Sequence, residues 1–289
     1  MLPTAHTRDG LALHLREWSV AEPLGTVLVV HGLGEHIGRY AHVAAALNAA
    51  GWRVVGYDQR GHGASEGARG VIRHGDDPCT DLAQVIDAVR DDVPGPLLLL
   101  GHSLGGLVVA RFVAEGLVRA ALRASWAREV DGLVLSSPAL DPGLNGLQKL
   151  LLAVMGGLAP ELGVNNGLKP AWISRDAQVV AAYQADPLVH DRVAARLVRF
   201  IVDGGAFVRE QASRWTVPTL LMWAGSDRCV APAGSAAFAE AAPTGVVTAR
   251  LFAPLFHEIF NEPEQREVFA VLGQWLARRA TWERPTLHD

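Results

Sequence analysis

The sequence is poor in cysteine, balanced in charge and free of long apolar runs. Only Cys79 and Cys229 are cysteines among 289 residues, too few for a disulfide-stabilised scaffold and without metal-ligand spacing. The 26 basic and 30 acidic residues give a net charge of −4, which leaves no basic footprint for nucleic acid. The composition therefore predicts no metal and no nucleic-acid partner.

Segments typical of secretion or membrane insertion are also missing. The first ten residues contain no apolar secretory core. The longest apolar stretch, residues 147–159, includes Lys149 and two glycines and is too short to span a bilayer. We therefore expect a cytoplasmic protein, in which 49% hydrophobic residues can bury a sizeable core.

The chain does contain the motif Gly-x-Ser-x-Gly at residues 101–105. An apolar run at 97–100 precedes the motif, and a helix-like run at 107–115 follows it. This pattern indicates a strand, a sharp turn and a helix, in which side chains at the two glycines would collide with their neighbours. Such a turn exposes the Ser103 hydroxyl for attack on a carbonyl, and the Leu104 N–H at the helix start can bind a developing oxyanion.

Strand-like and helix-like segments alternate over the first 140 residues and again after residue 216. This alternation predicts an α/β fold with a mostly parallel sheet, covered by helices on both faces. The predicted strands are 11–18, 26–30, 53–58, 97–100, 132–136, 219–225 and 246–252. The predicted helices are 40–50, one that begins after Asp76, 107–115, 232–242 and 262–278.

Residues 141–215 interrupt this alternation with helical patterns and no convincing strand. Further helices are predicted here at 179–183 and 193–202. We therefore predict a core of residues 1–140 and 216–289, with a helical cap at 141–215 inserted after about the sixth strand. Apolar residues at helical spacing give the cap one stripe, which comprises Leu147, Leu150, Leu151, Val154 and Leu158.

Two residues late in the chain suit the base and the acid that a serine nucleophile requires. A serine hydroxyl attacks only when a base takes its proton and a third group orients that base. In hydrolases with this elbow, the acid and then the histidine follow the serine in the chain. Asp227 follows the predicted strand 219–225, and His257, one of 11 histidines, lies in the loop after the last strand. The alternative for Asp227 is a turn residue, and His102 is expected to point away from the site.

The loop after strand 26–30 suits a second oxyanion donor, the N–H of Leu33. Gly32 and Gly34 also begin a pattern typical of dinucleotide binding, but Ile37 stands where the third glycine is required. We therefore predict no nucleotide cofactor.

Three stretches carry a family resemblance: residues 31–36 (HGLGEH) with Arg39-Tyr40, residues 57–67 (YDQRGHGASEG), and the elbow at 101–106 (GHSLGG). They resemble the α/β-hydrolase superfamily and, within it, the monoacylglycerol lipase and lysophospholipase-like group. The similarity extends over nearly the whole chain, including Asp186-Pro187-Leu188 in the cap.

The resemblance implies hydrolysis of a fatty acyl ester without a cofactor. Ser103 would be acylated, His257 would act as base and acid, and Asp227 would orient His257. Glu35 and Arg39 match polar positions that lie near the glycerol end of the substrate in such lipases. The alternative for this pair is a surface contact that anchors the loop.

The apolar stripe of the cap suits an acyl chain, so Leu147 and Leu151 are predicted to line the substrate site. The alternative is a helix that simply packs on the sheet. The same helix would also suit transient contact with a membrane surface.

One departure from the group leaves the polar end of the substrate open. Such lipases can carry another polar residue soon after the catalytic histidine, where this chain has Phe260. Lysophospholipids and simple esters therefore remain alternatives to monoacylglycerols, as do acyl transfer and aminopeptidase activity on the same fold. A different class of alternative is a non-catalytic ligand-binding protein, which would not need all three residues of the predicted triad.

Overall fold

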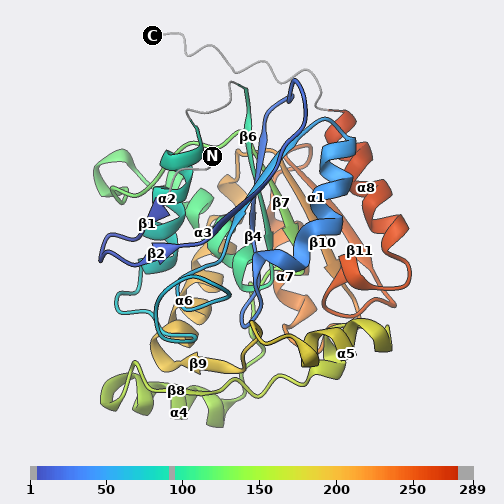
Figure 1. Ribbon diagram of the computed structural model, residues 1–289. Coiled ribbons are helices and arrows are strands. Elements are labelled where there is room, and N and C mark those ends of the chain that lie inside the picture. The colour runs from blue at the N-terminus through green and yellow to red at the C-terminus, as the bar shows by residue number, and fades with distance from the viewer. Residues whose placement is uncertain (1–4, 91–94, 279–289) are drawn as a thin grey trace.

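The computed structural model describes residues 5–90 and 95–278 (Figure 1). Over these residues, seven strands form one sheet in the order β11-β10-β7-β6-β4-β5-β3. Neighbouring strands are parallel except for β3 and β5, which confirms the predicted, mostly parallel sheet. The strands are β3 (Leu15–Trp18), β4 (Thr26–Val30), β5 (Arg53–Tyr57), β6 (Leu97–His102), β7 (Gly132–Ser136), β10 (Thr219–Ala224) and β11 (Val247–Phe252).

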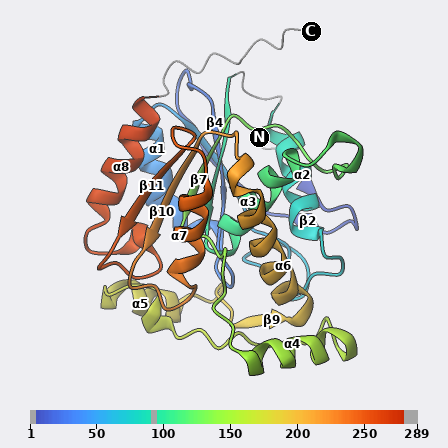
Figure 2. The same ribbon diagram turned by 180° about the vertical axis from the view of Figure 1, so that it is seen from behind.

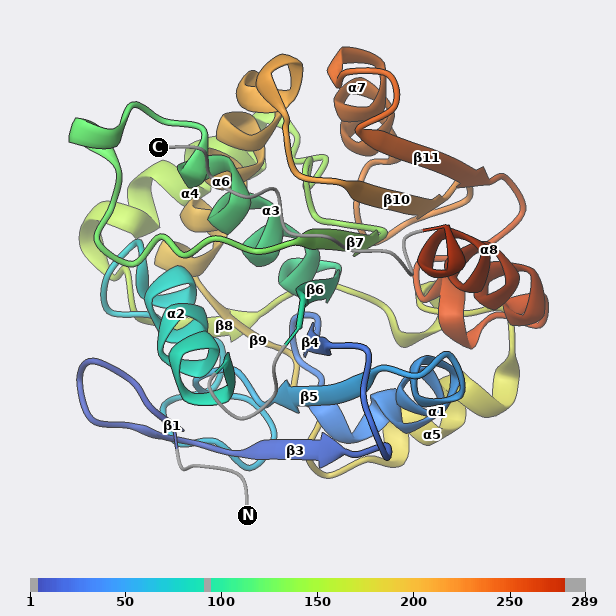
Figure 3. The ribbon, with the colours of Figure 1, turned by 90° about the horizontal axis from the view of Figure 1, so that it is seen from above.

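Helices cover both faces of the sheet, which lies between two helical layers in Figure 3. One layer holds α1 (Ala41–Ala49) and α8 (Gln265–Ala277), whose apolar sides share one buried cluster with the strands. A second buried cluster lies on the opposite face of the sheet and includes residues of four helices. These helices are α2 (Asp77–Arg90), α3 (Leu104–Gly116), α6 (Ala195–Gln211) and α7 (Pro232–Ala241). Helices on both faces are expected, because parallel sheets are buried on both sides.

The predicted strand 11–18 is divided at His14, because the residues before and after His14 pair with different strands. β1 (Ala5–His6) and β2 (Ala12–Leu13) form a separate antiparallel pair, whereas β3 joins the main sheet. Between β2 and β3, the His14 N–H donates to Ser65 Oγ at 2.8 Å instead of to a neighbouring strand. The prediction of one strand over 11–18 is therefore wrong at this residue.

The cap lies beneath the sheet in Figure 1, at the carboxyl ends of the parallel strands. It contains α4 (Gly146–Leu158) and α5 (Ala177–Ala185), close to their predicted positions. It also contains β8 (Gly163–Asn165) and β9 (Arg192–Ala194), paired antiparallel, so the prediction that this region has no strand is wrong. Strands of three residues are too short to show alternation in the sequence.

Helix α6 falls inside the predicted cap range but packs beside α3, as Figure 2 shows from behind. Its residues Leu197, Phe200 and Val208 are buried in the same cluster as the helices that cover the sheet. The cap segment that leaves the core therefore follows β7 and returns with β9. Short 3-10 turns complete the structure at Ile37–Tyr40, Ala120–Leu122, Pro170–Trp172, Ala212–Arg214 and Ile259–Asn261.

Candidate active site

Ser103 occupies the sharp turn between β6 and α3. Its φ of 53° and ψ of −118° lie in a sparsely populated region, which costs a non-glycine residue about 1–3 kcal/mol. A Cβ on Gly105 would lie 2.1 Å from the Val30 carbonyl oxygen, and one on Gly101 would lie 2.4 Å from the Gly105 carbonyl oxygen. The predicted collisions at both glycines are therefore confirmed, and only glycine fits on either side of the serine.

Asp227 and His257 are joined by a hydrogen bond although 30 residues separate them. Asp227 follows β10 and His257 follows β11, and because these strands are parallel neighbours their ends bring the two side chains together. His257 Nδ1 lies 2.7 Å from Asp227 Oδ2, while Asp227 Oδ1 accepts from the N–H groups of Cys229 and Val230 at 2.8 and 3.1 Å. Since Nδ1 donates its proton to the carboxylate, Nε2 keeps a free lone pair.

The surroundings of His257 favour its protonated form. Burial alone would lower the pKa of this imidazole, but the nearby Asp227 carboxylate, with Glu258 and Glu35 behind it, raises the pKa above its ordinary value. The pKa of Asp227 is held below its usual range, because the attraction of His257 outweighs the effect of burial. The pair is therefore built to hold a proton on His257 while Asp227 stays ionised.

His102 lies beside His257 rather than away from the site. The two ring centroids are 4.7 Å apart, so the expectation that His102 points elsewhere is wrong. Its position follows from β6, whose last residue it is, and from a hydrogen bond of 3.1 Å between its Nδ1 and Ser136 Oγ. Burial, followed by the neighbouring His257, lowers the pKa of His102 to about 4, so His102 stays neutral beside the second imidazole.

The loop that carries Leu33 lies against Ser103. A Cβ on Gly32 would lie 3.1 Å from Ser103 Cβ and 2.9 Å from Glu35 Oε1, so a side chain there would crowd both residues. Gly34 has a φ of 78°, and its carbonyl accepts from the His190 N–H of the cap at 2.9 Å. Leu104 is the first residue of α3, where backbone N–H groups have no partner within the helix. Both predicted oxyanion donors thus belong to segments that meet at the serine.

Glu35 and Arg39 lie in a buried ionic network. Glu35 accepts from the Gly32 N–H at 2.6 Å and from the Tyr40 hydroxyl at 2.7 Å, and it also pairs with Arg39. Arg39 in turn binds both carboxylate oxygens of Glu258 at 2.7 Å. Burial would raise the pKa of Glu35, but Arg39 above all lowers it to about 2, so this carboxylate stays ionised.

This network joins two loops of the site. Glu35 holds the backbone of the Leu33 loop, and Glu258 directly follows His257, so Arg39 connects the two through their carboxylates. Glu258 was not predicted from the sequence, although its position beside a candidate catalytic histidine was a usable signal. The pair Glu35 and Arg39 is not a surface contact, because their side chains are only 5% and 12% exposed.

Glu262, also missed from the sequence, holds the other side of the histidine loop. Its side chain is fully buried and accepts from the Phe256 N–H at 2.8 Å, one residue before His257. The same carboxylate accepts from Ser174 and from Arg175 in the cap, at 2.8 and 2.6 Å. One buried carboxylate thus fixes the position of the histidine loop relative to the cap.

A cavity of about 550 Å³ brings these groups together between the core and the cap. The core contributes Ser103, His257, Leu33, Glu35 and Glu258 to its wall, among others. The cap contributes residues between positions 165 and 191, which include both apolar and polar side chains. The size lies in the range of ligand-binding pockets, and Ser103 and His257 share the same space.

The residues of the cap stripe whose side chains the structure describes do not line the cavity. Leu151 is 59% exposed and does not line the cavity, and the side chain of Leu147 lies outside the described part of the chain. Arg39 also lies outside the wall of the cavity and contributes to a smaller space beside Tyr40 and Phe260. Phe260 itself is buried against Phe269, with ring centroids 5.2 Å apart, so it is a core residue.

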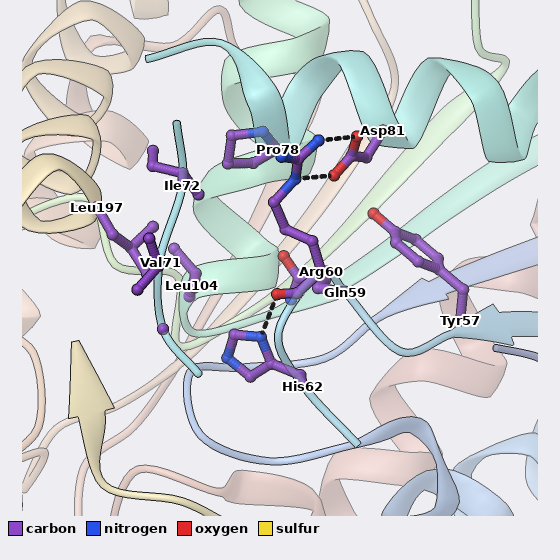
Figure 4. Close-up of a pocket in the computed structure, with 11 residues that line it drawn as sticks. Tyr57, Gln59, Arg60, His62, Val71, Ile72, Pro78, Asp81, Leu104 and Leu197 are labelled. Atoms are coloured by element: carbon purple, nitrogen blue, oxygen red, sulfur yellow. Dashed lines mark hydrogen bonds and ion pairs between the residues drawn. The ribbon is translucent and has the colours of Figure 1, made fainter. Parts of the chain in front are cut away.

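The segment from Asp58 to Gly67 folds into a buried loop beside the site. Asp58 accepts from the Ile37 N–H at 2.7 Å and from the Ala64 N–H at 2.8 Å, so it ties this loop to the segment after Leu33. Figure 4 shows Arg60 and Asp81 facing each other through two hydrogen bonds at a small cavity. That cavity measures about 10 Å³, room for one water at most, and the contacts of the loop with Ile37 and Asp81 support the neighbouring segments of the site.

The fold and the geometry of the site together define a class of protein. A serine in a strand–turn–helix elbow, an acid and a histidine after the last two strands, and a mostly parallel sheet under a cap are the features of an α/β-hydrolase. Over residues 21–264 the chain matches the family described as "Serine aminopeptidase, S33". The chain belongs to this family of serine hydrolases, and within it to the group similar to monoacylglycerol lipases.

Individual relatives support this assignment. The chain is 36% identical to the monoacylglycerol lipase of Mycolicibacterium smegmatis, over 88% of this chain and 89% of that protein. It is 32% identical to the phospholipase YtpA of Bacillus subtilis, over 87% and 95%. The crystal structure of a monoacylglycerol lipase from Paleococcus ferrophilus matches with a TM-score of 0.79 and 34% identity, over 92% of this chain and 98% of that one.

Among the described residues, none of the helices combines the length and the apolar character that crossing a membrane requires.

Proposed function

We propose that the protein hydrolyses fatty acyl esters, with monoacylglycerols as the preferred substrates, through an acyl-enzyme on Ser103. The observation that carries this proposal is the hydrogen bond of 2.7 Å between Asp227 and His257 beside a cavity that also contains the elbow serine. A protein that only binds ligands would need neither the strained serine nor the paired imidazole.

In the first half-reaction, His257 Nε2 takes the proton of Ser103 as the hydroxyl oxygen attacks the ester carbonyl. The N–H groups of Leu33 and Leu104 stabilise the oxyanion that forms on the carbonyl oxygen. His257 then gives the proton to the departing alcohol, and the acyl group remains on Ser103. A water molecule reverses these roles in the second half-reaction and releases the fatty acid.

Glu35 and Arg39 receive distinct roles in this proposal. Glu35 lines the cavity and is ionised, so the remaining lone pair on its Oε2 suits a hydroxyl group at the polar end of the substrate. Arg39 acts through Glu35 and Glu258 and is a positioning residue, because it does not reach the cavity wall. This division replaces a single substrate-binding role for the pair.

The substrate preference is tested by kcat/KM on p-nitrophenyl acetate, butyrate, octanoate and laurate, and on mono-, di- and triacylglycerols of one chain length. We expect octanoate to exceed acetate, because each buried methylene contributes about 0.8 kcal/mol, partly offset by ordering of the chain. We expect monoacylglycerol to exceed triacylglycerol, since Glu35 in the cavity wall suits the free hydroxyl groups that a triacylglycerol lacks. A maximum at acetate, or equal rates on mono- and triacylglycerol, would contradict the proposal.

A lysophospholipid is the second candidate substrate, on one specific observation. Lys169 of the cap lies in the cavity wall, where an ammonium group would attract a phosphate. The similarity to a protein named as a phospholipase agrees with this candidate. A higher kcat/KM on lysophosphatidylcholine than on monoacylglycerol of the same chain, reversed by Lys169→Met, would favour it over the leading proposal.

We also propose that the cap contacts lipid surfaces. The cap exposes a group of large apolar side chains, which are Leu151, Val154, Leu158, Leu162 and Val164, and Leu168 is exposed in the cavity wall. Such a group suits insertion at the boundary of headgroups and acyl chains.

Flotation with phosphatidylcholine vesicles should fall in the Leu158→Asp variant, in which the most exposed of these side chains is replaced by a charged one. The control variant Leu122→Asp, far from the cap, should float like the wild type. Equal flotation of all three proteins would remove this role.

A further inference from the structure

Cys229 lies beside the catalytic pair without a part in the proposed reaction. It follows Asp227 by two residues, and its N–H donates to Asp227 Oδ1 at 2.8 Å, so the turn brings the thiol back toward the carboxylate. Cys229 and His257 line the same cavity. Potential ligand atoms of Asp227, Cys229 and His257 all lie within 4.8 Å of one another.

These three side chains offer the donors that a thiophilic cation prefers. Zinc binds carboxylate oxygen, thiolate sulfur and imidazole nitrogen at about 2.0–2.3 Å, and sites with three protein ligands leave a fourth position for water. In a tetrahedral site with such bonds, two ligand atoms of one zinc ion are about 3.3–3.8 Å apart. Ligand atoms that lie within 4.8 Å of one another must therefore approach by no more than about 1.5 Å to share one ion. Magnesium, in contrast, prefers oxygen ligands, and of these three side chains only the Asp227 carboxylate supplies oxygen.

The charges around the site favour a cation. The Asp227, Glu35 and Glu258 carboxylates all act on His257, whereas Arg39 is the guanidinium within their network. Arg39 is bound to Glu35 and Glu258, whereas Asp227 is paired with the imidazole and with two backbone N–H groups. The cavity wall also contains Lys169, together with the further carboxylates of Asp186 and Asp191. An excess of negative charge in a half-enclosed cavity concentrates divalent cations.

We propose that Asp227, Cys229 and His257 form a binding site for a thiophilic divalent cation such as Zn²⁺, which inhibits the enzyme when it is occupied. The Cys229 thiol releases its proton to solvent as the sulfur binds the ion. If the ion takes His257 Nδ1, the hydrogen bond to Asp227 is lost, and if it takes Nε2, the base is blocked. Either arrangement prevents proton transfer from Ser103, so inhibition rests on the proposed function, whereas binding does not.

The test separates binding from inhibition. Binding is measured on the chelator-treated Ser103→Ala variant, which keeps all three ligands, by competition with a zinc-sensitive chromophore. Inhibition of ester hydrolysis by ZnCl₂ is measured on the wild type. We expect Cys229→Ala to weaken both by at least about tenfold, because even outer-sphere partners of a metal site are worth 10–100-fold in affinity. Cys229→Ser, which preserves the size of the side chain, provides a second variant if alanine impairs folding.

Cys79→Ala is the matched control, since Cys79 is the other cysteine of the chain and is buried in α2. It should respond to zinc like the wild type, and MgCl₂ at the same concentrations should not inhibit. Equal zinc affinity with and without Cys229 would overturn the proposed site. Binding that depends on Cys229 without any inhibition of the wild type would support the site and would instead contradict the catalytic role of His257.

Discussion

Ser103→Ala should lower the kcat for ester hydrolysis by about 10⁴–10⁶-fold, the usual loss when one member of such a triad is removed. The reason is chemical, because alanine has no oxygen that could carry the acyl group. The fold should persist, because the contacts of Ser103 with its surroundings are made by main-chain atoms that alanine keeps. The Ser103 N–H donates to the Ser136 carbonyl at 3.0 Å, and the Ser103 carbonyl accepts from the Ala139 N–H. The measurement is a turnover assay combined with circular dichroism on the purified variant.

Ser125→Ala provides the matched control for this experiment. Ser125 is exposed on the loop between α3 and β7, outside the elbow, so the same substitution there should leave kcat and the thermal midpoint unchanged. Residual turnover above a few per cent in folded Ser103→Ala would reject Ser103 as the nucleophile. It would then favour either another hydrolytic residue or an activity that does not pass through an acyl-enzyme.

Asp227→Asn should lower kcat by about 10⁴-fold while preserving the shape of the side chain, as in comparable triads. An asparagine amide can donate to His257 Nδ1, which would force the proton onto Nε2 and leave no acceptor for the Ser103 hydroxyl. Asp87→Asn, in an exposed pair with Arg128, makes the same isosteric change without touching the site and should retain full activity. A loss of less than about tenfold in the kcat of Asp227→Asn, compared with about 10⁴-fold in other triads, would mean that Asp227 is only a turn residue.

The pH dependence adds a second measurement on the same variant. His257 must be neutral to act as a base, and its pKa is raised above 6.5 because Asp227 and two further carboxylates outweigh burial. The kcat/KM of the wild type should therefore fall on the acid side with a midpoint above pH 6.5. Removing the Asp227 charge lowers the pKa, so the midpoint of Asp227→Asn should move to lower pH. A midpoint that does not move would show that another group controls the acid limb.

Much of the fold could be predicted because its signals are local. The buried strands were visible as short apolar runs, and the elbow was visible because glycine is needed on both sides of Ser103. The order of serine, acid and histidine directed attention to Asp227 and His257, and parallel pairing of β10 with β11 explains why the two side chains meet.

The misses concern contacts between distant segments. The three-residue strands β8 and β9 carry no periodicity, and the break at His14 depends on Ser65, which lies 51 residues away. The ionic network through Arg39 needed Glu258, 219 residues further along the chain. Helical spacing showed that α4 has an apolar stripe, but it could not show whether that stripe faces the cavity or the solvent.

The proposed function depends most directly on covalent chemistry at Ser103. The decisive measurement is reaction of the native protein with a fluorophosphonate probe, followed by proteolysis and tandem mass spectrometry. The proposed function predicts one adduct per chain on Ser103, absent in Ser103→Ala and formed far more slowly in Asp227→Asn. An unlabelled protein, or an adduct on another serine with Ser103 unmodified, would contradict it.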